Sequence, residues 1–434
     1  MPCGFAHDTR SLAPGQVFVA IRTERRDGHE YLSDAQRAGA SAALVARCDP
    51  AVSLPQLVVA DTVAAFQAIA REHRRAFRGP VIGISGSAGK TSTKNLLAAL
   101  LGGEPTVLAT EGNLNNHLGV PLTLTRLDPA IHRYAVIEAG ISGEGEMAPL
   151  ASMIEPDIGI ITLVAPAHLE ALGSLANVAR EKAQLLSAAG VAIFNKSCLD
   201  FAAFRDLTVR TMLVEPTEVV LPKEHAPDKV YFTISHRDDL TSASVAIGGL
   251  APQVFAFPRV SDGMAHNAVL AVCAALWLGI SPEVIRRRLQ PWRPSAMRGE
   301  IRRESNRLVY LDCYNANPAS MADALANFYQ IAPQAAPRLL VIGGMEELGE
   351  DSRRYHHDLG RMLHLRPGDF CYVIGSEAEA VRMGAIEGGN RSEQMAIAST
   401  VEPIAAHIAA FQGSVFVKGS RRHALERALG AGTH

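Results

Sequence analysis

The feature that most constrains this chain is a glycine-rich loop between an apolar strand and a helix, at residues 81–92. The segment reads Val-Ile-Gly-Ile-Ser-Gly-Ser-Ala-Gly-Lys-Thr-Ser, and a helix-forming run at 95–101 follows it. Glycines let backbone N–H groups approach phosphate oxygens, and the helix dipole and Lys90 add positive potential. The hydroxyl of Thr91 or Ser92 is a ligand for Mg²⁺. The order of these parts predicts a phosphate-binding loop in an α/β domain.

The loop is shorter than the common form of this motif. The pattern G-x-x-x-x-G-K-[ST] requires a glycine where this chain has Ile84, and the shorter G-x-x-G-K-T remains. Short glycine turns between a strand and a helix also occur without a ligand, so the strand, the helix and other parts of the chain must support this interpretation. The residues expected to contact nucleotide phosphates are Gly86, Ser87, Ala88, Gly89, Lys90, Thr91 and Ser92.

Length and composition indicate a soluble protein of several domains. The chain has 434 residues, of which 48% are hydrophobic and 20% charged, and its formal net charge is −2. The near-neutral charge and sparse aromatic residues argue against a nucleic-acid partner. No apolar run reaches the roughly 20 residues that cross a bilayer. Six scattered cysteines without zinc spacing, and an N-terminus without a signal peptide, predict a cytoplasmic protein.

Alternating strands and helices divide the chain into three blocks. Residues 1–79 form a small α/β unit, residues 80–297 a parallel sheet buried on both faces, and residues 298–434 a second doubly wound sheet. Short alternating strands at 229–257 indicate an antiparallel patch. The longer predicted strands are Val81–Ser85, Tyr134–Glu138, Ile158–Val164, Val191–Asn195, Leu308–Leu311, Arg338–Ile342, Phe370–Ile374 and Ser414–Val417. The predicted fold class is α/β, with a central P-loop ATPase sheet and a C-terminal Rossmann-like sheet.

Polar residues follow two strands of the middle block. Glu138 ends one strand, and His168 comes shortly after the next. Because the carboxyl ends of parallel strands meet at one sheet edge, both side chains are expected beside the phosphate loop, where Glu138 can hold a Mg²⁺ that bridges nucleotide phosphates. The ordinary alternatives are an acidic residue that starts a loop and a structural histidine. The polar loop 112–121 is either a substrate contact or a turn rich in Asn and Gly.

Two polar loops follow strands in the third block. Residues 312–318 read Asp-Cys-Tyr-Asn-Ala-Asn-Pro, and residues 418–421 read Lys-Gly-Ser-Arg. The second repeats the plan of strand, glycine, basic residues and helix, which predicts a site for an anion or a carboxylate. Its alternative is a basic loop without a ligand.

Together these segments resemble the Mur ligases, ATP-dependent amide ligases of peptidoglycan precursor synthesis. The strings Tyr-Asn-Ala-Asn-Pro at 314–318 and Lys-Gly-Ser-Arg at 418–421 are specific to the MurF branch, which joins D-alanyl-D-alanine to UDP-N-acetylmuramoyl-tripeptide. The resemblance implies three domains: a UDP-sugar domain, an ATP-binding domain and an amine-substrate domain. It spans nearly the whole chain, through segments 8–15, 86–91, 112–121, 168–174, 312–318, 343–349 and 418–421.

The resemblance also implies roles for individual residues. Lys90 would contact the β- and γ-phosphates of ATP, Thr91 and Glu138 would bind one Mg²⁺, and His168 would help to hold a second. Lys182 matches a lysine that family members carbamylate to gain an anionic metal contact, and it completes the catalytic set. ATP would also contact Asn267, Arg298 and Asp312. Substrate-binding residues would be Asp8, Thr9, Arg10, Asn113, Asn115, Asn116, His117, Tyr314, Asn315, Asn317, Lys418, Ser420 and Arg421.

The chain departs from the family pattern at several positions. Mur ligases usually carry H-N-x-x-N before the helix that ends the central domain, whereas this chain has Gly-Met-Ala-His-Asn at 263–267. Gln184, Cys313 and Gly344 replace the usual Glu, Ser and Asp. The N-terminal domain is expected to be shortened. These changes affect substrate identity and base contacts more than the phosphate chemistry.

Three functions are therefore weighed. The leading hypothesis is a ligase of the MurF type that uses ATP and Mg²⁺, acts on a UDP-sugar peptide and D-alanyl-D-alanine, and works as a monomer. The second is a paralogue that joins a different acid and amine in a specialised pathway. The third is a degenerate nucleotide-binding module without catalysis. The joint presence of Lys90, Glu138, His168 and Lys182 argues against the third.

Overall fold

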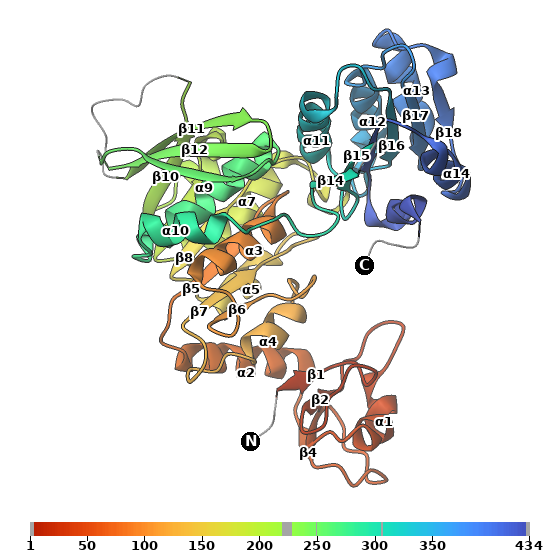
Figure 1. Cartoon of the computed structure of the whole chain (residues 1–434). Coiled ribbons are helices and arrows are strands. Elements are labelled where there is room, and N and C mark those ends of the chain that lie inside the picture. Colours follow the sequence, from red (N-terminus) through yellow and green to blue (C-terminus); the bar gives the residue numbers. More distant parts are fainter. Residues whose placement is uncertain (1–3, 219–227, 249, 305–306, 431–434) are drawn as a thin grey trace.

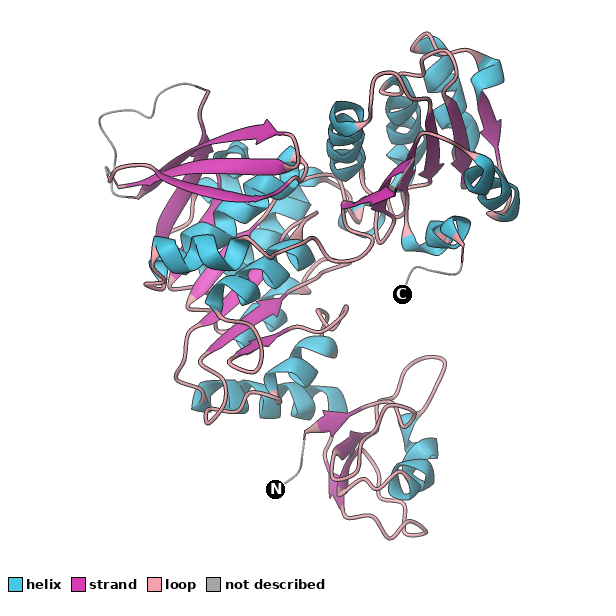
Figure 2. Cartoon of the chain, viewed as in Figure 1, coloured by secondary structure: helices cyan, strands magenta, loops and turns pink. Residues whose placement is uncertain are grey.

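The computed structural model describes residues 4–218, 228–248, 250–304 and 307–430, and these residues form three α/β units (Figure 1). Each unit is built on its own sheet, with four, nine and six strands from the N- to the C-terminal unit. Helices flank the sheets (Figure 2), and the N- and C-terminal units lie on different sides of the central one (Figure 1). The α/β fold class predicted from the sequence is confirmed.

The N-terminal unit is a small parallel sheet in the order β1-β2-β3-β4. Phe18 and Leu32 are part of one small core, and Val19, Leu44 and Phe66 are part of another. The elements are β1 (Phe5–Ala6), β2 (Val17–Val19), α1 (Leu32–Arg37), β3 (Ala42–Val45), β4 (Gln56–Val58) and α2 (Thr62–Ala76).

Helix α2 joins the N-terminal unit to the central one. Asp61 begins it by accepting bonds from the N–H groups of Val63 and Ala64. Along its length the helix packs on α4 (Gly119–Leu124) and α5 (Met147–Ile154) of the central unit. Near its end, the buried Arg74 donates from Nε to the carbonyl of Ile154 at 2.8 Å and from Nη2 to that of Glu155 at 2.7 Å. These carbonyls end α5, so a guanidinium satisfies groups that lack partners in the helix.

The central sheet places β5 between β7 and β8, in the order β13-β12-β11-β10-β9-β8-β5-β7-β6. Its strands are parallel except for the antiparallel pairs β11–β12 and β12–β13, which confirms the patch predicted at 229–257. The strands are β5 (Val81–Ser85), β6 (Val107–Ala109), β7 (Tyr134–Glu138), β8 (Ile158–Ile161), β9 (Val191–Asn195), β10 (Arg210–Pro216), β11 (Lys229–Arg237), β12 (Leu240–Ile247) and β13 (Gln253–Pro258).

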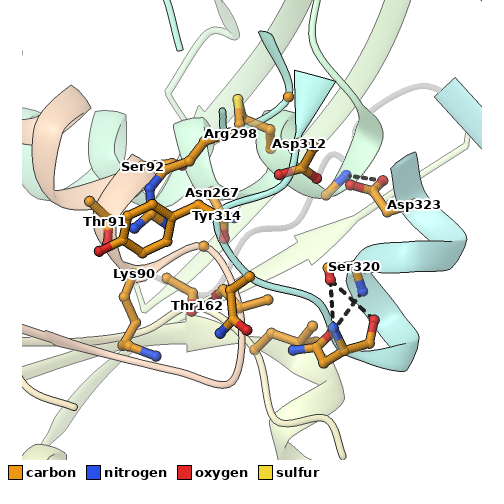
Figure 3. Close-up of a pocket in the computed structure, with 18 of the residues that line it drawn as sticks. Lys90, Thr91, Ser92, Thr162, Asn267, Arg298, Asp312, Tyr314, Ser320 and Asp323 are labelled. Carbon is orange, nitrogen blue, oxygen red and sulfur yellow. Dashed lines mark hydrogen bonds between the residues drawn. The ribbon is translucent and has the colours of Figure 1, made fainter. Parts of the chain in front are cut away.

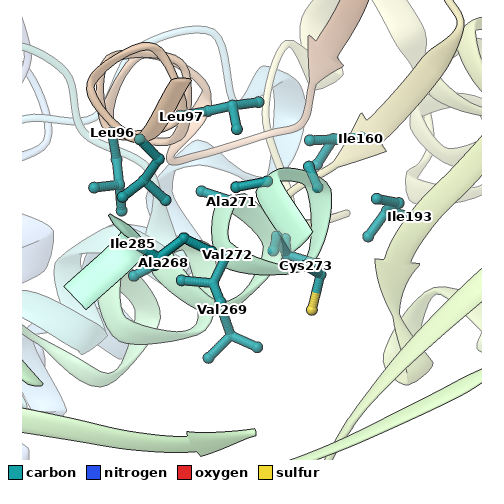
Figure 4. Close-up of a cluster of buried hydrophobic side chains, with 14 of the residues drawn as sticks. Leu96, Leu97, Ile160, Ile193, Ala268, Val269, Ala271, Val272, Cys273 and Ile285 are labelled. Atoms are coloured by element: carbon teal, nitrogen blue, oxygen red, sulfur yellow. The ribbon is translucent and has the colours of Figure 1, made fainter. Parts of the chain in front are cut away.

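Both faces of the central sheet are covered by helices. One face packs against α3 (Lys90–Leu101), α9 (Asp262–Trp277) and α10 (Pro282–Leu289). The other packs against α4, α5 and α7 (Leu175–Ser187), with α6 (Leu169–Leu172) and α8 (Ala202–Arg205) nearby. Helix α9 is apolar on nearly all sides because it lies between α3, α10 and the sheet, and its residues 268–275 are buried (Figure 4).

The C-terminal sheet has the order β14-β15-β19-β16-β17-β18, with an antiparallel edge strand β14 beside otherwise parallel strands. Helices α11, α12 and α13 cover one face, and α14 covers the other. The elements are β14 (Glu300–Glu304), β15 (Arg307–Asp312), α11 (Pro318–Ile331), β16 (Arg338–Gly343), α12 (Ser352–Arg361), β17 (Phe370–Ile374), α13 (Ala378–Glu387), β18 (Met395–Ile397), α14 (Glu402–Ala410) and β19 (Ser414–Lys418).

The prediction of a helix after Lys418 is wrong. The chain there forms two short 3₁₀ helices, Arg421–His423 and Leu425–Leu429. They are separated by Ala424, whose φ of 47° lies in the left-handed region and interrupts the helical backbone. The helix-terminus argument for an anion site at 418–421 therefore has no support. No helix in the described parts of the chain is long and apolar enough to cross a membrane.

The buried guanidinium of Arg74 makes a testable contribution to stability. Arg74→Ala leaves the carbonyls at the end of α5 without partners, which should lower the free energy of unfolding by about 1–3 kcal/mol. Arg75→Ala removes a half-exposed ion pair with Glu155 and should change the same quantity by about 0.5 kcal/mol or less. Urea unfolding followed by circular dichroism measures both. Equal losses would contradict the anchoring role of Arg74.

Candidate active site

Two glycines shape the loop between β5 and α3. Gly86 has φ of 150° and Gly89 has φ of 81°, values that side chains rarely allow. A Cβ atom on Gly86 would lie 1.8 Å from Oγ1 of Thr162, and one on Gly89 would lie 2.1 Å from Nδ2 of Asn267. Neighbouring elements therefore press on the loop from two sides. Thr162 also donates from Oγ1 to the carbonyl of Ala88 at 2.5 Å, which fixes the middle of the loop.

Lys90 begins α3 and folds back over this loop. Its Nζ donates to the carbonyl of Gly86 at 2.8 Å. Burial lowers the pKa of Lys90, the carboxylate of Glu138 opposes this, and the charge of Arg298 adds to the lowering. The ammonium thus lies in a desolvated place between a carboxylate and a second cation. Such a place favours a ligand that brings several negative charges.

Glu138 and Thr91 meet at the edge of the sheet. Glu138 is only 2% exposed at the end of β7, and its Oε2 accepts a hydrogen bond from Oγ1 of Thr91 at 2.8 Å. Its Oε1 accepts a bond from Nδ2 of Asn115 at 2.8 Å, and its N–H donates to Oγ1 of Thr110 at 2.9 Å. The phosphate loop and the Asn-rich loop are therefore linked through one carboxylate.

The C-terminal unit closes over the loop. Asn317 donates from Nδ2 to the carbonyl of Ser87 at 3.0 Å, and its Oδ1 caps α11 by accepting a bond from the N–H of Ser320. The guanidinium of Arg298 lies 3.8 Å from the ring centroid of Tyr314 (Figure 3). Asp312 accepts a bond from the buried Nζ of Lys418 at 2.5 Å.

These groups line one cavity of about 280 Å³ between the central and C-terminal units (Figure 3). It brings together most residues that the sequence predicted to bind nucleotide or substrate. They are Ser87, Ala88, Gly89, Lys90, Thr91, Ser92, Asn113, Asn115, Glu138, Asn267, Arg298, Asp312, Tyr314, Asn315, Asn317 and Lys418.

Several predicted residues do not line the cavity. Asn116 accepts a bond at Oδ1 from the N–H of Gly119, the first residue of α4, at 2.9 Å. The carbonyl of His117 accepts a bond from Nε2 of Gln67 on α2 at 3.0 Å. The others outside it are Gly86 beneath the loop, Asp8, Thr9, Arg10, His168, Lys182, Ser420 and Arg421.

The predicted UDP-sugar residues lie on the N-terminal unit, away from the cavity (Figure 1). Asp8 and Arg10 form an exposed ion pair, and the hydrogen bonds from Arg10 lower the pKa of Asp8 to about 2. At the other end of the chain, Arg421 pairs with Glu426 at 2.7 Å, and the N–H of Ser420 donates to the carbonyl of Gly344 at 3.1 Å.

His168 and Lys182 lie near the charge of Lys90, although they do not line the cavity. His168 has φ of 55°, and its Nδ1 is hydrogen-bonded to Oε2 of Glu347 from the C-terminal unit. Burial lowers the pKa of His168, Glu347 opposes this, and the charges of Lys90 and Lys182 lower it further. Lys182 is 2% exposed, and no group in the described ranges accepts a hydrogen bond from its ammonium. Burial, and then the charge of Lys90, lower its pKa well below the ordinary value, and Glu181 opposes this.

Sequence reasoning missed part of the cavity wall. Met264 and His266 were noted only as departures from a pattern, yet both line the cavity, and the ring of His266 packs edge-on against Phe232 at 5.1 Å. Thr162, which follows β8, and Asp323 on α11 also line it. The strand predicted at Ile158–Val164 contained Thr162, which lies just after the end of the observed β8. Nothing in the sequence shows which face of α11 meets the central unit.

The residues present fit one Mg²⁺ better than two. A hydroxyl and a carboxylate 2.8 Å apart, at Thr91 and Glu138, match the oxygen ligands that Mg²⁺ prefers. Among the described residues, no group of three or more His, Cys, Asp or Glu is placed to hold a metal ion. Phosphate and water oxygens would therefore have to supply the remaining ligands. His168 is engaged by Glu347 instead.

Comparison with known proteins agrees with this architecture. Residues 84–274 match the Mur ligase middle domain, and residues 297–427 match the domain described as Mur ligase, glutamate ligase domain. The UDP-N-acetylmuramoyl-tripeptide–D-alanyl-D-alanine ligase of Escherichia coli (strain K12) is 32% identical over 98% of this chain and 92% of its own length. The chain belongs to the Mur ligase family. The family resemblance and the ligase class predicted from the sequence are confirmed.

Solved MurF structures resemble this Mur ligase over nearly its full length. A crystal structure of MurF from Acinetobacter baumannii has a TM-score of 0.85 and 28% identity, and covers 98% of this chain and 92% of its own. MurF from Thermotoga maritima, solved in complex with ADP, has a TM-score of 0.82 and 25% identity, and covers 99% of this chain and 96% of its own. Both comparisons include the N-terminal unit, which neither matched domain description reaches.

The tight fit around Gly86 predicts a local loss of binding. Gly86→Ala introduces a Cβ that collides with Thr162, so the loop must move away from the phosphate position. We expect ATP affinity to fall about tenfold or more, while the melting temperature changes by only a few degrees. Gly143→Ala is the control, because its Cβ meets nothing closer than 3.5 Å. Calorimetric titration with ATP measures the effect, and unchanged affinity would contradict the steric argument.

Proposed function

We propose that this Mur ligase joins D-alanyl-D-alanine to UDP-N-acetylmuramoyl-tripeptide, with ATP and Mg²⁺, in peptidoglycan precursor synthesis. The observation that carries the proposal is one cavity in which Lys90 and the Thr91–Glu138 pair face residues 312–317 of the C-terminal unit. The full-length likeness to MurF enzymes supports the choice of substrates. The monomeric state and the cytoplasmic location remain predictions.

The chemistry requires an activated acid. A carboxylate oxygen of the tripeptide attacks the γ-phosphorus of ATP, and the bond to the β,γ-bridging oxygen breaks to release ADP. The amine nitrogen of D-alanyl-D-alanine then attacks the acyl carbon of the acyl phosphate. The carbon–oxygen bond to phosphate breaks, the nitrogen loses a proton, and an amide and inorganic phosphate remain.

The residues of the cavity suit charge stabilisation and positioning. Lys90 would place its ammonium on the β- and γ-phosphates as negative charge moves toward ADP. Thr91 and Glu138 would hold Mg²⁺, which neutralises charge on the transferring phosphoryl group when bound. Asn113 and Asn115 are suited to orient the acid, and Tyr314 and Asn315 to orient the amine.

Closure of the C-terminal unit would exclude water from the acyl phosphate. The bond from Asn317 to the loop carbonyl of Ser87 holds the two units together at the phosphate position. A water molecule competing with the amine would hydrolyse the intermediate and waste ATP. Arg298, at the junction of the units, would contact ATP from the same side.

Lys182 is proposed to be carbamylated. A neutral amine is needed to attack CO₂: its nitrogen bonds to the carbon, and a proton is released. Burial and the adjacent charge of Lys90 favour this neutral form, because they lower the pKa of Lys182. The resulting anion would balance the charge of Lys90.

One assay separates the ligase from its alternatives. Purified protein is mixed with Mg²⁺-ATP, UDP-N-acetylmuramoyl-tripeptide and D-alanyl-D-alanine, and phosphate release and product mass are measured. We expect stoichiometric phosphate and amide product. Turnover only with other acids or amines would favour the paralogue. That hypothesis rests on the expected shortening of the N-terminal domain and on the altered positions, of which Gly263 and Met264 lie in the cavity wall. No phosphate with any pair would leave only the non-catalytic module.

The phosphate role of Lys90 predicts a severe kinetic defect. Lys90→Met keeps the length and burial of the side chain but removes its charge, so kcat should fall about 10³-fold or more. Far-ultraviolet circular dichroism should be unchanged. Lys196→Met, which removes an exposed lysine paired with Glu215, is the control and should retain full activity. Substantial turnover by Lys90→Met would show that another group stabilises the transferring phosphoryl.

The unpartnered ammonium of Lys182 predicts opposite effects on stability and activity. Because its folded-state pKa is lowered, the unfolded chain binds one more proton between that pKa and about 10.4, and stability rises with pH in this window. Lys182→Met should remove this contribution and raise the unfolding free energy at pH 7 by about 1–3 kcal/mol, while turnover falls.

Urea unfolding at pH 7 and pH 9 in CO₂-depleted buffer measures the unfolding free energy and its change with pH. The release of phosphate measures turnover. A parent protein and a Lys182→Met variant with the same dependence on pH would contradict the burial of an unpaired amine. If Lys182→Met loses turnover but the turnover of the parent protein does not respond to bicarbonate, the result would count against carbamylation.

A further inference from the structure

One carboxylate in the cavity has no part in the proposed reaction. Asp323 lies on α11 and lines the cavity near Asp312 (Figure 3). Lys418 neutralises Asp312, whereas no cation in the described ranges forms an ion pair with Asp323. Burial raises the pKa of Asp323, and hydrogen bonds from Ser261 and Gly263 oppose this. A carboxylate kept in such a place needs a reason.

Asp323 binds the beginning of α9, in the central unit. Its Oδ1 accepts a hydrogen bond from the N–H of Gly263 at 2.8 Å, and the hydroxyl of Ser261 bonds to it as well. Ser261 is also the N-cap of α9 and accepts a bond from the N–H of Met264 at 3.3 Å. The first N–H groups of a helix lack partners within it and favour negative charge. A side chain of one unit therefore completes a helix of the other.

The contact depends on the absence of a side chain at position 263. A Cβ there would lie 2.7 Å from Oδ2 of Asp323 and 2.9 Å from its Cγ. The φ of Gly263 is not among the positive values, so its backbone conformation does not require glycine. Glycine within a helix is less favourable than alanine by about 1 kcal/mol. The space taken by Asp323 is therefore the physical reason for glycine at this position.

Three contacts tie α9, α11 and the phosphate loop to one another. Asn317 at the start of α11 holds the loop carbonyl of Ser87, and Asn267, one turn after Gly263 on α9, packs on Gly89 of the loop. The bond between Asp323 and Gly263 is the third contact, and it joins the two helices to each other. Arg259, just before α9, also donates to Asn327 and Gln330 near the end of α11. The bond between Asp323 and Gly263 lies between that contact and Asn317, and Asp323 itself lines the cavity, so this bond sets how the start of α11 lies over the phosphate position.

We propose that Gly263 and Asp323 are a matched pair that positions the C-terminal unit over the nucleotide, and that Asp323 is a positioning residue for the ligase reaction. The inference rests on the proposed function for its effect on turnover. Its structural part, the coupling of the two residues in closing the cavity on a nucleotide, does not require ligase activity.

A double-mutant cycle tests the pair. Gly263→Ala alone pushes Asp323 out of place, and Asp323→Ala alone removes the bond; each should weaken affinity for Mg²⁺-AMP-PNP and lower kcat by about tenfold. In the Asp323→Ala background, Gly263→Ala meets no carboxylate and should change both by about twofold or less. Asp323→Asn keeps an acceptor at Oδ1 and should restore most of the parent activity, whereas Asp323→Leu, which has a similar size but no acceptor and which a general packing role would tolerate, should not.

The readouts separate the possible failures. Calorimetric affinity for AMP-PNP reports on closure without turnover, so a parent protein that binds but does not ligate would defeat the proposed function and leave the cycle interpretable. Losses that simply add in the double variant would overturn the matched pair, as would Asp323→Asn behaving like Asp323→Ala. Thermal melts of the parent protein and of every variant identify any variant that fails to fold, and the Asp323→Asn comparison then decides.

Discussion

The rest of the structure depends on the loop that contains Gly86 and Gly89, because neighbouring residues leave no room for a side chain on either glycine. Thr162 after β8 and Asn267 on α9 occupy the space that a Cβ on Gly86 or Gly89 would need. Thr162 follows the neighbouring strand β8, and Asn267 lies on α9, which covers one face of the sheet, so strand order and helix packing together fix the loop. Lys90, Thr91 and Glu138 take their positions from this loop and from the adjacent end of β7. The missing glycine at position 84 costs nothing here, because Ile84 is a core residue of β5 and is not part of the loop.

Around the phosphate loop, buried lysines outnumber carboxylates, whereas Asp312 and Asp323 line the cavity from the C-terminal unit. Burial lowers the pKa values of Lys90, Lys94 and Lys182, and Glu138 is the carboxylate that opposes this for both Lys90 and Lys94. Lys418 is satisfied by Asp312 and so does not contribute to the excess. A polyanionic ligand would supply the missing negative charge, and a carbamate on Lys182 would add negative charge as well. The arrangement is easier to understand as a site prepared for phosphate than as a stable ion-pair network.

Sequence reasoning succeeded where burial is strongest. The strands Val81–Ser85, Tyr134–Glu138, Val191–Asn195 and Phe370–Ile374 were predicted with the bounds that the structure has, because apolar runs flanked by turns mark strands covered on both faces. Strands β1 and β6, of two and three residues, were not predicted.

The residues of the site could also be predicted only in part. Residues within one loop, from Ser87 to Ser92, could be predicted from local spacing. Asp323 could not, since its role depends on how two helices far apart in sequence meet. The helix expected after Lys418 failed because no spacing rule reveals the left-handed Ala424.

The three units are joined in different ways, and this difference bears on the order of events in the reaction. The N-terminal unit is attached through α2, whose Arg74 and packed face bind it to α4 and α5. From α2, Gln67 holds the carbonyl of His117, and the same loop carries Asn115, which holds Glu138. The expected UDP-sugar unit is therefore connected through one short path to the proposed metal ligand.

The C-terminal unit is held to the phosphate site by a few polar contacts, at Asn317, Asp323 and Glu347. These contacts are made by single side chains, whereas α2 packs along its length on both α4 and α5. With the proposed roles of the units, the half of the site that would bind the acid is assembled in advance. The half that would bind the amine is then the part that opens to admit substrates and closes for chemistry.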